Sequence, residues 1–188
     1  MQFTDDFRKA NVVEGGDVRN HPVHSSWEPP HDGLFKINTD AVLSEKDKAS
    51  GLRVVISDNK GRVMAFLCRN VGGYYEPCIA EAMAIRRGFR LAMESGLVPV
   101  VLESDALEVV NLLQSKIVPN SELGVIIHDI SDIVDNSFLC SFHFVHRLAN
   151  KVAHGLTKLA LAHRGEFVWL EDCPLSVEGV LGDISSFL

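Results

Sequence analysis

The stretch Phe35-Lys36-Ile37-Asn38-Thr39-Asp40-Ala41 decides the fold class. Its side chains alternate in character with a period of two residues, which is typical of a half-buried strand. Two further β-rich runs follow at residues 51–57 and 62–68, joined by Asp58-Asn59-Lys60-Gly61. Asn and Gly between two such runs indicate an antiparallel hairpin. The stretch therefore predicts the first of three antiparallel strands.

The elements after this hairpin alternate between helices and strands. Apolar residues recur at helical spacing in several segments, and a short, nearly all-apolar run indicates a buried, parallel strand. Helices are expected at residues 79–96, 106–115, 121–134 and 149–163, and strands at residues 98–103 and 141–146. This order predicts an α/β fold, in which helices flank a five-stranded mixed sheet of three antiparallel strands followed by parallel strands.

The length of the chain, 188 residues, suits one compact domain with tails. Residues 1–26 carry few apolar side chains and are expected to form a linker or a disordered arm. The domain is expected to span residues 27–165, starting at Trp27-Glu28-Pro29-Pro30. Residues 166–188 form a tail that is apolar enough to dock on the domain.

The composition restricts the class of protein. No apolar run approaches the roughly 20 residues of a membrane span, and no basic stretch precedes an apolar one as in a secretory signal. The four cysteines lack C-x-x-C spacing, so we expect structural thiols and a nuclear or cytoplasmic location. The net charge of −7 argues against tight non-specific binding of nucleic acid. We expect a monomer without contact to membranes.

Five segments, in this order, resemble a known family. They are Trp27-Glu28-Pro29-Pro30, Lys36-Ile37-Asn38-Thr39-Asp40, Ala80-Glu81-Ala82, Glu103-Ser104-Asp105 and Arg147-Leu148-Ala149-Asn150-Lys151-Val152-Ala153-His154. Together they are similar to the plant ribonuclease H-like family, which is related to the ribonuclease H domain of non-LTR retrotransposon reverse transcriptases. No segment is specific alone, but five in order on matching predicted elements make a strong signal. The resemblance implies a ribonuclease H-like fold.

The resemblance also implies an endonuclease that hydrolyses the RNA strand of RNA/DNA hybrids by two-metal-ion catalysis, with Mg²⁺ or Mn²⁺. Asp40, Glu81 and Asp105 would be catalytic metal ligands. Each carboxylate also has a simpler interpretation, since an Asp at a strand end is often a turn residue and a Glu in a first helical turn can interact with the helix dipole. Asp40, however, falls inside a strand, where Asp is disfavoured.

The fourth ligand departs from the pattern of active ribonucleases H. They place an Asp four residues after an Asn, and the corresponding residue here is His154. Imidazole ligates Mn²⁺ but is a poor ligand for Mg²⁺, so His154 is expected to hold one ion weakly. Alternatively, His154 is a neutral side chain on a helix surface.

Other candidate residues surround this set. His146 is a candidate proton carrier, with a structural His as the alternative. Candidate nucleic-acid-binding residues are Arg86, Arg90, Arg147 and Lys151, with a solvated helix surface as the alternative. A second function also stays open. His154 and the acidic net charge suit a catalytically silent, retroelement-derived domain that binds RNA, a hybrid or a protein partner.

Overall fold

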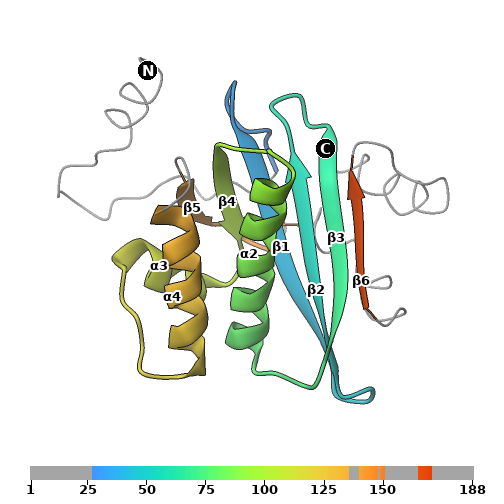
Figure 1. Ribbon diagram of the computed structural model, residues 1–188, viewed down its shortest axis with the longest axis vertical. Helices are drawn as coiled ribbons and strands as arrows, with labels where there is room; N and C mark the ends of the chain where they lie inside the picture. The colour runs from blue at the N-terminus through green and yellow to red at the C-terminus, as the bar shows by residue number, and fades with distance from the viewer. Residues whose placement is uncertain (1–26, 136–139, 148, 151–164, 171–188) are drawn as a thin grey trace.

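The computed structural model describes residues 27–135, 140–147, 149–150 and 165–170. Its centre is a mixed sheet with the strand order β5-β4-β1-β2-β3-β6 (Figure 1). The helices α2 (Pro77–Glu94), α3 (Leu107–Ser115) and α4 (Glu122–Asp135) lie on one face of this sheet. The predicted α/β fold is confirmed.

The first three strands form the predicted meander. They are β1 (Phe35–Ser44), β2 (Ala49–Ser57) and β3 (Val63–Gly72), and each pairs antiparallel with the next. β1 continues to Ser44, four residues beyond Asp40, because β2 begins at Ala49 and pairs with its end. Asp40 therefore lies within a central strand and not at its end, which argues against the interpretation as a turn residue.

The next two strands lie parallel to β1. β4 (Val100–Ser104) pairs with β1, and β5 (Cys140–Phe144) pairs with β4. The change of direction at β1 leaves β1 flanked by an antiparallel strand on one side and a parallel strand on the other. The carboxyl end of β4 therefore reaches the middle of β1, where Asp40 lies.

Helix α2 packs closely on the central strands. Gly88 permits this approach, because a Cβ atom at that position would lie 3.0 Å from Cγ2 of Ile37. Phe89, the next residue, is buried and meets Phe142 of β5 edge to face, with ring centroids 5.9 Å apart. These contacts fix α2 along the sheet, and so fix the height of Glu81 above it.

The expected strand count was wrong, because the sheet has a sixth strand among the described residues. β6 (Gly165–Leu170) pairs antiparallel with β3 and forms the edge of the sheet. Trp169 stacks on Phe66 with ring centroids 4.4 Å apart. Most of β6 comes from the residues that the sequence assigned to the tail. Apolar side chains there show that a segment docks, but they do not distinguish docking by side chains from pairing by backbone.

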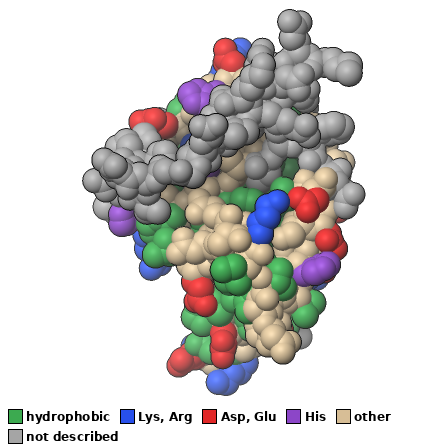
Figure 2. Space-filling view, turned by 90° about the vertical axis from the view of Figure 1, so that its left-hand side faces the viewer, with side chains coloured by type: hydrophobic (Ala, Val, Ile, Leu, Met, Phe, Trp, Pro, Cys, Tyr) green, Lys and Arg blue, Asp and Glu red, His purple; other side chains and the backbone are tan. Residues whose placement is uncertain are grey.

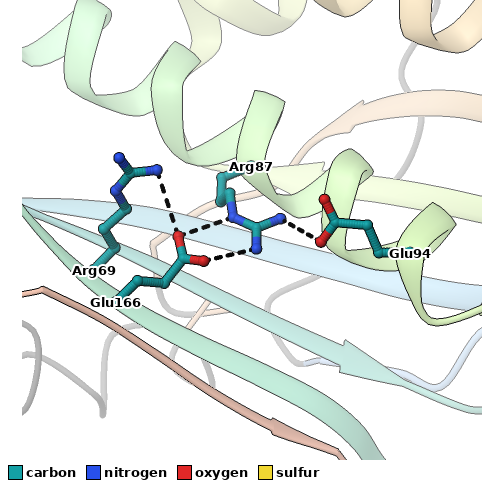
Figure 3. Close-up of polar contacts among 4 residues, drawn as sticks. All are labelled: Arg69, Arg87, Glu94 and Glu166. Carbon is teal, nitrogen blue, oxygen red and sulfur yellow. Dashed lines mark hydrogen bonds and ion pairs between the residues drawn. The ribbon is translucent and has the colours of Figure 1, made fainter.

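An ion-pair network joins β6 to α2. The carboxylate of Glu166 accepts hydrogen bonds from both Nε and Nη2 of Arg87, at 2.9 and 2.8 Å, and from Arg69 of β3 (Figure 3). Arg87 also donates to Glu94 at 3.0 Å. These bonds raise the pKa of Arg87 and lower that of Glu166. Arg87 therefore has a structural role, in which it links α2 to β6.

Several expectations fall partly outside the described residues. The helix expected at residues 149–163 has only its first two residues described.

Cys68 and Cys78 are thiols, and burial raises the pKa of Cys68 to about 12. None of the helices in the described ranges is long and apolar enough to cross a membrane.

Gly124 near the start of α4 provides a test of the helical layer. A Cβ atom there would overlap the carbonyl oxygen of Pro119 in the preceding loop. We expect Gly124→Ala to lower the free energy of unfolding by about 2 kcal/mol, although Ala is the better helix former. Gly72→Ala is the matched control, because a Cβ atom at Gly72 would meet nothing within 4 Å. Urea denaturation measures both; equal stabilities of the two variants would contradict the packing described here.

Candidate active site

Strand register brings Asp40 and Asp105 to the same level. Thr39 of β1 pairs with Ser104, the last residue of β4, and the strands run parallel. Asp40, and Asp105 directly after β4, therefore emerge side by side. Asp40 is buried and Asp105 is half-buried. This juxtaposition follows the general rule that sites form beyond the carboxyl ends of parallel strands.

Glu81 approaches these two carboxylates from α2. The helix begins at Pro77, two residues earlier than expected, so Glu81 lies in its second turn and the first turn has no acidic residue. An interaction with the helix dipole, which fades beyond the first turn, therefore does not explain Glu81. Its Oε1 accepts a hydrogen bond from the backbone N–H of Ala41 at 3.1 Å.

The three carboxylates are electrostatically crowded. Burial raises the pKa of Glu81 to about 8, and the negative charges of Asp40 and Asp105 add to this effect. The Oε2 atom of Glu81 is buried and accepts no hydrogen bond from the described residues. A buried oxygen without a donor is costly unless a cation or a proton satisfies it.

Arg53 of β2 was not singled out from the sequence. It is the direct cross-strand partner of Asp40, and its side chain is only 1% exposed. Its Nη2 forms an ion pair with Oδ2 of Asp40. Desolvation lowers the pKa of Arg53 and Asp40 opposes that shift, but a guanidinium stays protonated in proteins. The site therefore contains a cation of its own.

A buried amide network also contacts Asp105. Nδ2 of Asn150 donates to Oδ1 of Asp105 and to the carbonyl oxygen of Thr39, each at 2.8 Å. Oδ1 of Asn150 accepts from Nδ2 of Asn38 at 3.3 Å, and Asn38 accepts from Trp27 at 2.9 Å. The network thus includes residues from four of the five segments that carried the family resemblance.

Lys36 and Glu103 extend the same network. They form an ion pair with Nζ and Oε1 2.5 Å apart, and Oε2 of Glu103 accepts from Asn38 at 3.3 Å. Nζ of Lys36 also lies 5.3 Å from the ring centroid of Trp27. Trp27 therefore anchors the start of the described chain against β1, and Asn38 helps to hold the side chain of Asn150 beside Asp105.

The donor set fits one divalent cation better than two. The oxygen of Glu81 without a donor, and the excess of negative charge around it, suit a cation beside Glu81. Oδ2 of Asp40, in contrast, is already bound by Arg53. In the part of the chain that the structure describes, no three acidic, His or Cys side chains are grouped to hold a metal ion.

The remaining predicted site residues differ in exposure and in whether they are described. Arg86 is tied to Asp129 of α4 with Nη1 and Oδ2 2.7 Å apart, whereas Arg90 and Arg147 are exposed. His146 is exposed just after β5 and meets the ring of Phe144 edge to face, with centroids 5.4 Å apart. Lys151 and His154 lie outside the described residues.

Described basic side chains do not gather on the surface formed by α3 and α4. Figure 2 shows the side of the molecule on which α3 and α4 lie, where the described Lys and Arg side chains are interspersed with acidic ones. Arg86 and Arg87 are both neutralised by carboxylates. Any phosphate contact from the described part of α2 therefore depends on Arg90.

Comparison with known proteins identifies the fold. The ribonuclease H1 of the archaeon Halobacterium salinarum is similar over 69% of this chain and 98% of its own, with a TM-score of 0.63 and 19% identity. The N-terminal ribonuclease H domain of a Mycobacterium tuberculosis protein covers 69% of this chain and 94% of its own, with a TM-score of 0.62 and 18% identity. LC11-RNase H1, solved with an RNA/DNA hybrid, covers 65% of this chain and 92% of its own, with a TM-score of 0.58 and 24% identity.

Comparison at the level of sequence identifies the family. No curated protein matches the chain. The family model described as reverse transcriptase-like matches residues 38–160, more than half of the chain and the region that contains Asp40, Glu81 and Asp105. The chain therefore belongs to the reverse transcriptase-like family, and its fold is that of ribonuclease H.

Proposed function

We propose that this protein hydrolyses the RNA strand of RNA/DNA hybrids with the help of a divalent metal ion. The observation that carries the proposal is that Asp40 of β1 and Asp105 after β4 lie near enough to Glu81 of α2 for their charges to raise its pKa. The described side chains are not grouped closely enough to hold an ion as they stand, so a bound ion would draw the carboxylates together. Fold elements alone do not require three buried or half-buried carboxylates at one point, because crowding them is unfavourable without a cation.

The roles of the residues follow from their surroundings. Glu81 and Asp105, with the remaining coordination capacity of Asp40, would hold Mg²⁺ or Mn²⁺. Such an ion, when bound, would polarise a phosphoryl oxygen and help to activate the attacking water. The backbone N–H of Ala41 orients Glu81, and Asn150 orients Asp105.

Substrate contacts are proposed for the exposed basic residues. Arg90 and Arg147, together with Lys151, would contact backbone phosphates, while 2′-hydroxyls in the wide minor groove would identify the RNA strand. Arg86 is a weaker candidate, because Asp129 already neutralises it. His146 is proposed as a proton carrier and His154 as a weak ligand, which would favour Mn²⁺ over Mg²⁺.

A hybrid cleavage assay with Glu81→Gln tests this function. The hybrid carries a label on its RNA strand and is incubated with Mg²⁺, with Mn²⁺ or with EDTA. We expect metal-dependent cleavage by the wild type, and a rate that is about 100-fold or more lower for Glu81→Gln. Loss of the carboxylate should weaken binding of the ion, which supplies several kcal/mol of transition-state stabilisation.

The stability of this variant separates catalysis from folding. Gln keeps the oxygen that accepts from Ala41, and it removes a charge that burial and two neighbouring carboxylates disfavour. Glu81→Gln should therefore unfold at the same or a higher urea concentration than the wild type. Glu94→Gln, on the same helix but 59% exposed at its side chain, is the matched control and should cleave normally. Cleavage that survives Glu81→Gln would exclude this site.

Binding without hydrolysis is the second candidate function. It is favoured by the Asp40–Arg53 ion pair, because Arg53 competes with any cation for Asp40. It predicts no turnover with either ion, together with hybrid binding that weakens steeply as salt is added.

A further inference from the structure

Arg53 is an unusual residue for its position. It lies in the middle of β2, a strand in which every residue is buried, between β1 and β3. Charged side chains are almost never fully buried unless they are paired, and the partner here is Asp40. The same Nη2 atom lies 3.5 Å from the carbonyl oxygen of Ala41. The guanidinium is thus held between Asp40 and Ala41, the residue whose backbone N–H binds Glu81.

The position of this guanidinium restricts what else Asp40 can bind. A metal ion bound to Oδ2 of Asp40, the oxygen that Arg53 contacts, would lie next to the guanidinium. Repulsion between these like charges would be strong, because the region has a low dielectric constant. Arg53 cannot relieve that repulsion by losing its proton. Because it is only 1% exposed, it also cannot reach a substrate at the surface.

We infer that Arg53 takes the place of one of two metal ions, so that the site binds one divalent ion, beside Glu81 and Asp105. Arg53 is then a positioning residue that fixes the carboxylate of Asp40 and supplies a permanent positive charge. The inference rests on the metal site of the proposed function, but it concerns the number of ions and not the reaction.

Calorimetric titration of the metal-free full chain with Mn²⁺ tests the inference. We expect one ion per wild-type chain. Arg53→Met, which removes the charge and keeps most of the side-chain volume, should bind a second ion or bind the first about 100-fold more tightly, because the repulsion is lost. Arg53→Lys keeps the charge and should bind one ion. Arg62→Met is the matched control, because Arg62 also pairs with an aspartate, Asp58, but is 66% exposed; it should bind as the wild type does.

Thermal melting provides a second measurement, since Arg53→Met leaves Asp40 buried without its partner. Mn²⁺ should raise the Tm of Arg53→Met more than that of the wild type, because the ion replaces the missing charge. Binding of two ions or none by the wild type would overturn the inference, as would Arg53→Met that binds like the wild type or stays unfolded in Mn²⁺. Absence of hybrid cleavage, with the expected binding pattern intact, would overturn only the proposed function.

Discussion

Asp40→Asn is expected to lower the free energy of unfolding of the metal-free protein by about 3 kcal/mol. Removing one partner of a buried ion pair leaves the other charge without compensation, and this costs more than the pair itself contributes. Arg53 would be that charge, at 1% exposure. Asn keeps an oxygen that can accept a hydrogen bond from Nη2 of Arg53. The expected loss is therefore at the lower end of the range of about 3–5 kcal/mol for removing one partner of a buried ion pair. Urea denaturation in EDTA measures it.

A double variant identifies the cause of this loss. In Asp40→Asn/Arg53→Met neither charge of this ion pair remains buried, so the double variant should be more stable than Asp40→Asn alone. Asp47→Asn, in the exposed β1–β2 turn, should change stability by no more than about 0.5 kcal/mol. Additive effects of the two substitutions would mean that Asp40 and Arg53 do not form the pair.

The loss of stability also bears on how a cleavage assay of Asp40→Asn is interpreted. A rate lost with this variant could result from unfolding or from a missing ligand, whereas Glu81→Gln has no such ambiguity because it removes a disfavoured charge. Loss of cleavage with both variants, scaled to the folded fraction, would therefore assign the two carboxylates to one site.

The sequence predicted the meander well because the pattern is local. Alternation from Phe35 to Asp40 and the turn at Asp58-Asn59-Lys60-Gly61 depend on neighbouring residues, and the structure has the strands where these signals indicate them. Asp58 stabilises that turn by accepting hydrogen bonds from the backbone N–H groups of Lys60 and Arg62, at 2.9 and 2.8 Å. Local chemistry of this kind can be predicted without knowledge of the fold.

Non-local pairing was harder to predict. β6 pairs with a strand about a hundred residues earlier, Asn70 with Gly165, and no residue in the segment 165–170 indicates that partner. Apolar side chains predicted docking of this segment, but backbone pairing depends on which edge of the sheet remains available.

Arg53 was missed for a related reason. The sequence does contain a signal, one charged residue within the apolar run Gly51-Leu52-Arg53-Val54-Val55. Its meaning depends on the register between β1 and β2, which places it opposite Asp40 and on the same face. From the sequence, His154 was expected to be the weak ligand of the metal site. In the described residues, the ion pair with Arg53 also reduces the capacity of Asp40 to bind a metal ion.

Asn150→Ala is expected to lower the free energy of unfolding by about 3 kcal/mol. Asn150 is 1% exposed, and it bonds Thr39, Asp105 and Asn38. Its removal leaves several buried polar atoms with fewer partners, at about 1–3 kcal/mol for each that stays unsatisfied. Asn111→Ala, on the exposed face of α3, is the control and should change stability by no more than about 0.5 kcal/mol.

Asn150→Asp distinguishes hydrogen bonding from packing in this network. Asp has nearly the same shape, so a loss caused only by a cavity would disappear. It lacks the Nδ2 donor, however, and would direct an oxygen at the carbonyl of Thr39 and the carboxylate of Asp105, two acceptors that now lie 2.8 Å from that donor. We therefore expect Asn150→Asp to be at least as unstable as Asn150→Ala at neutral pH, and a wild-type urea midpoint would show that Asn150 only fills space.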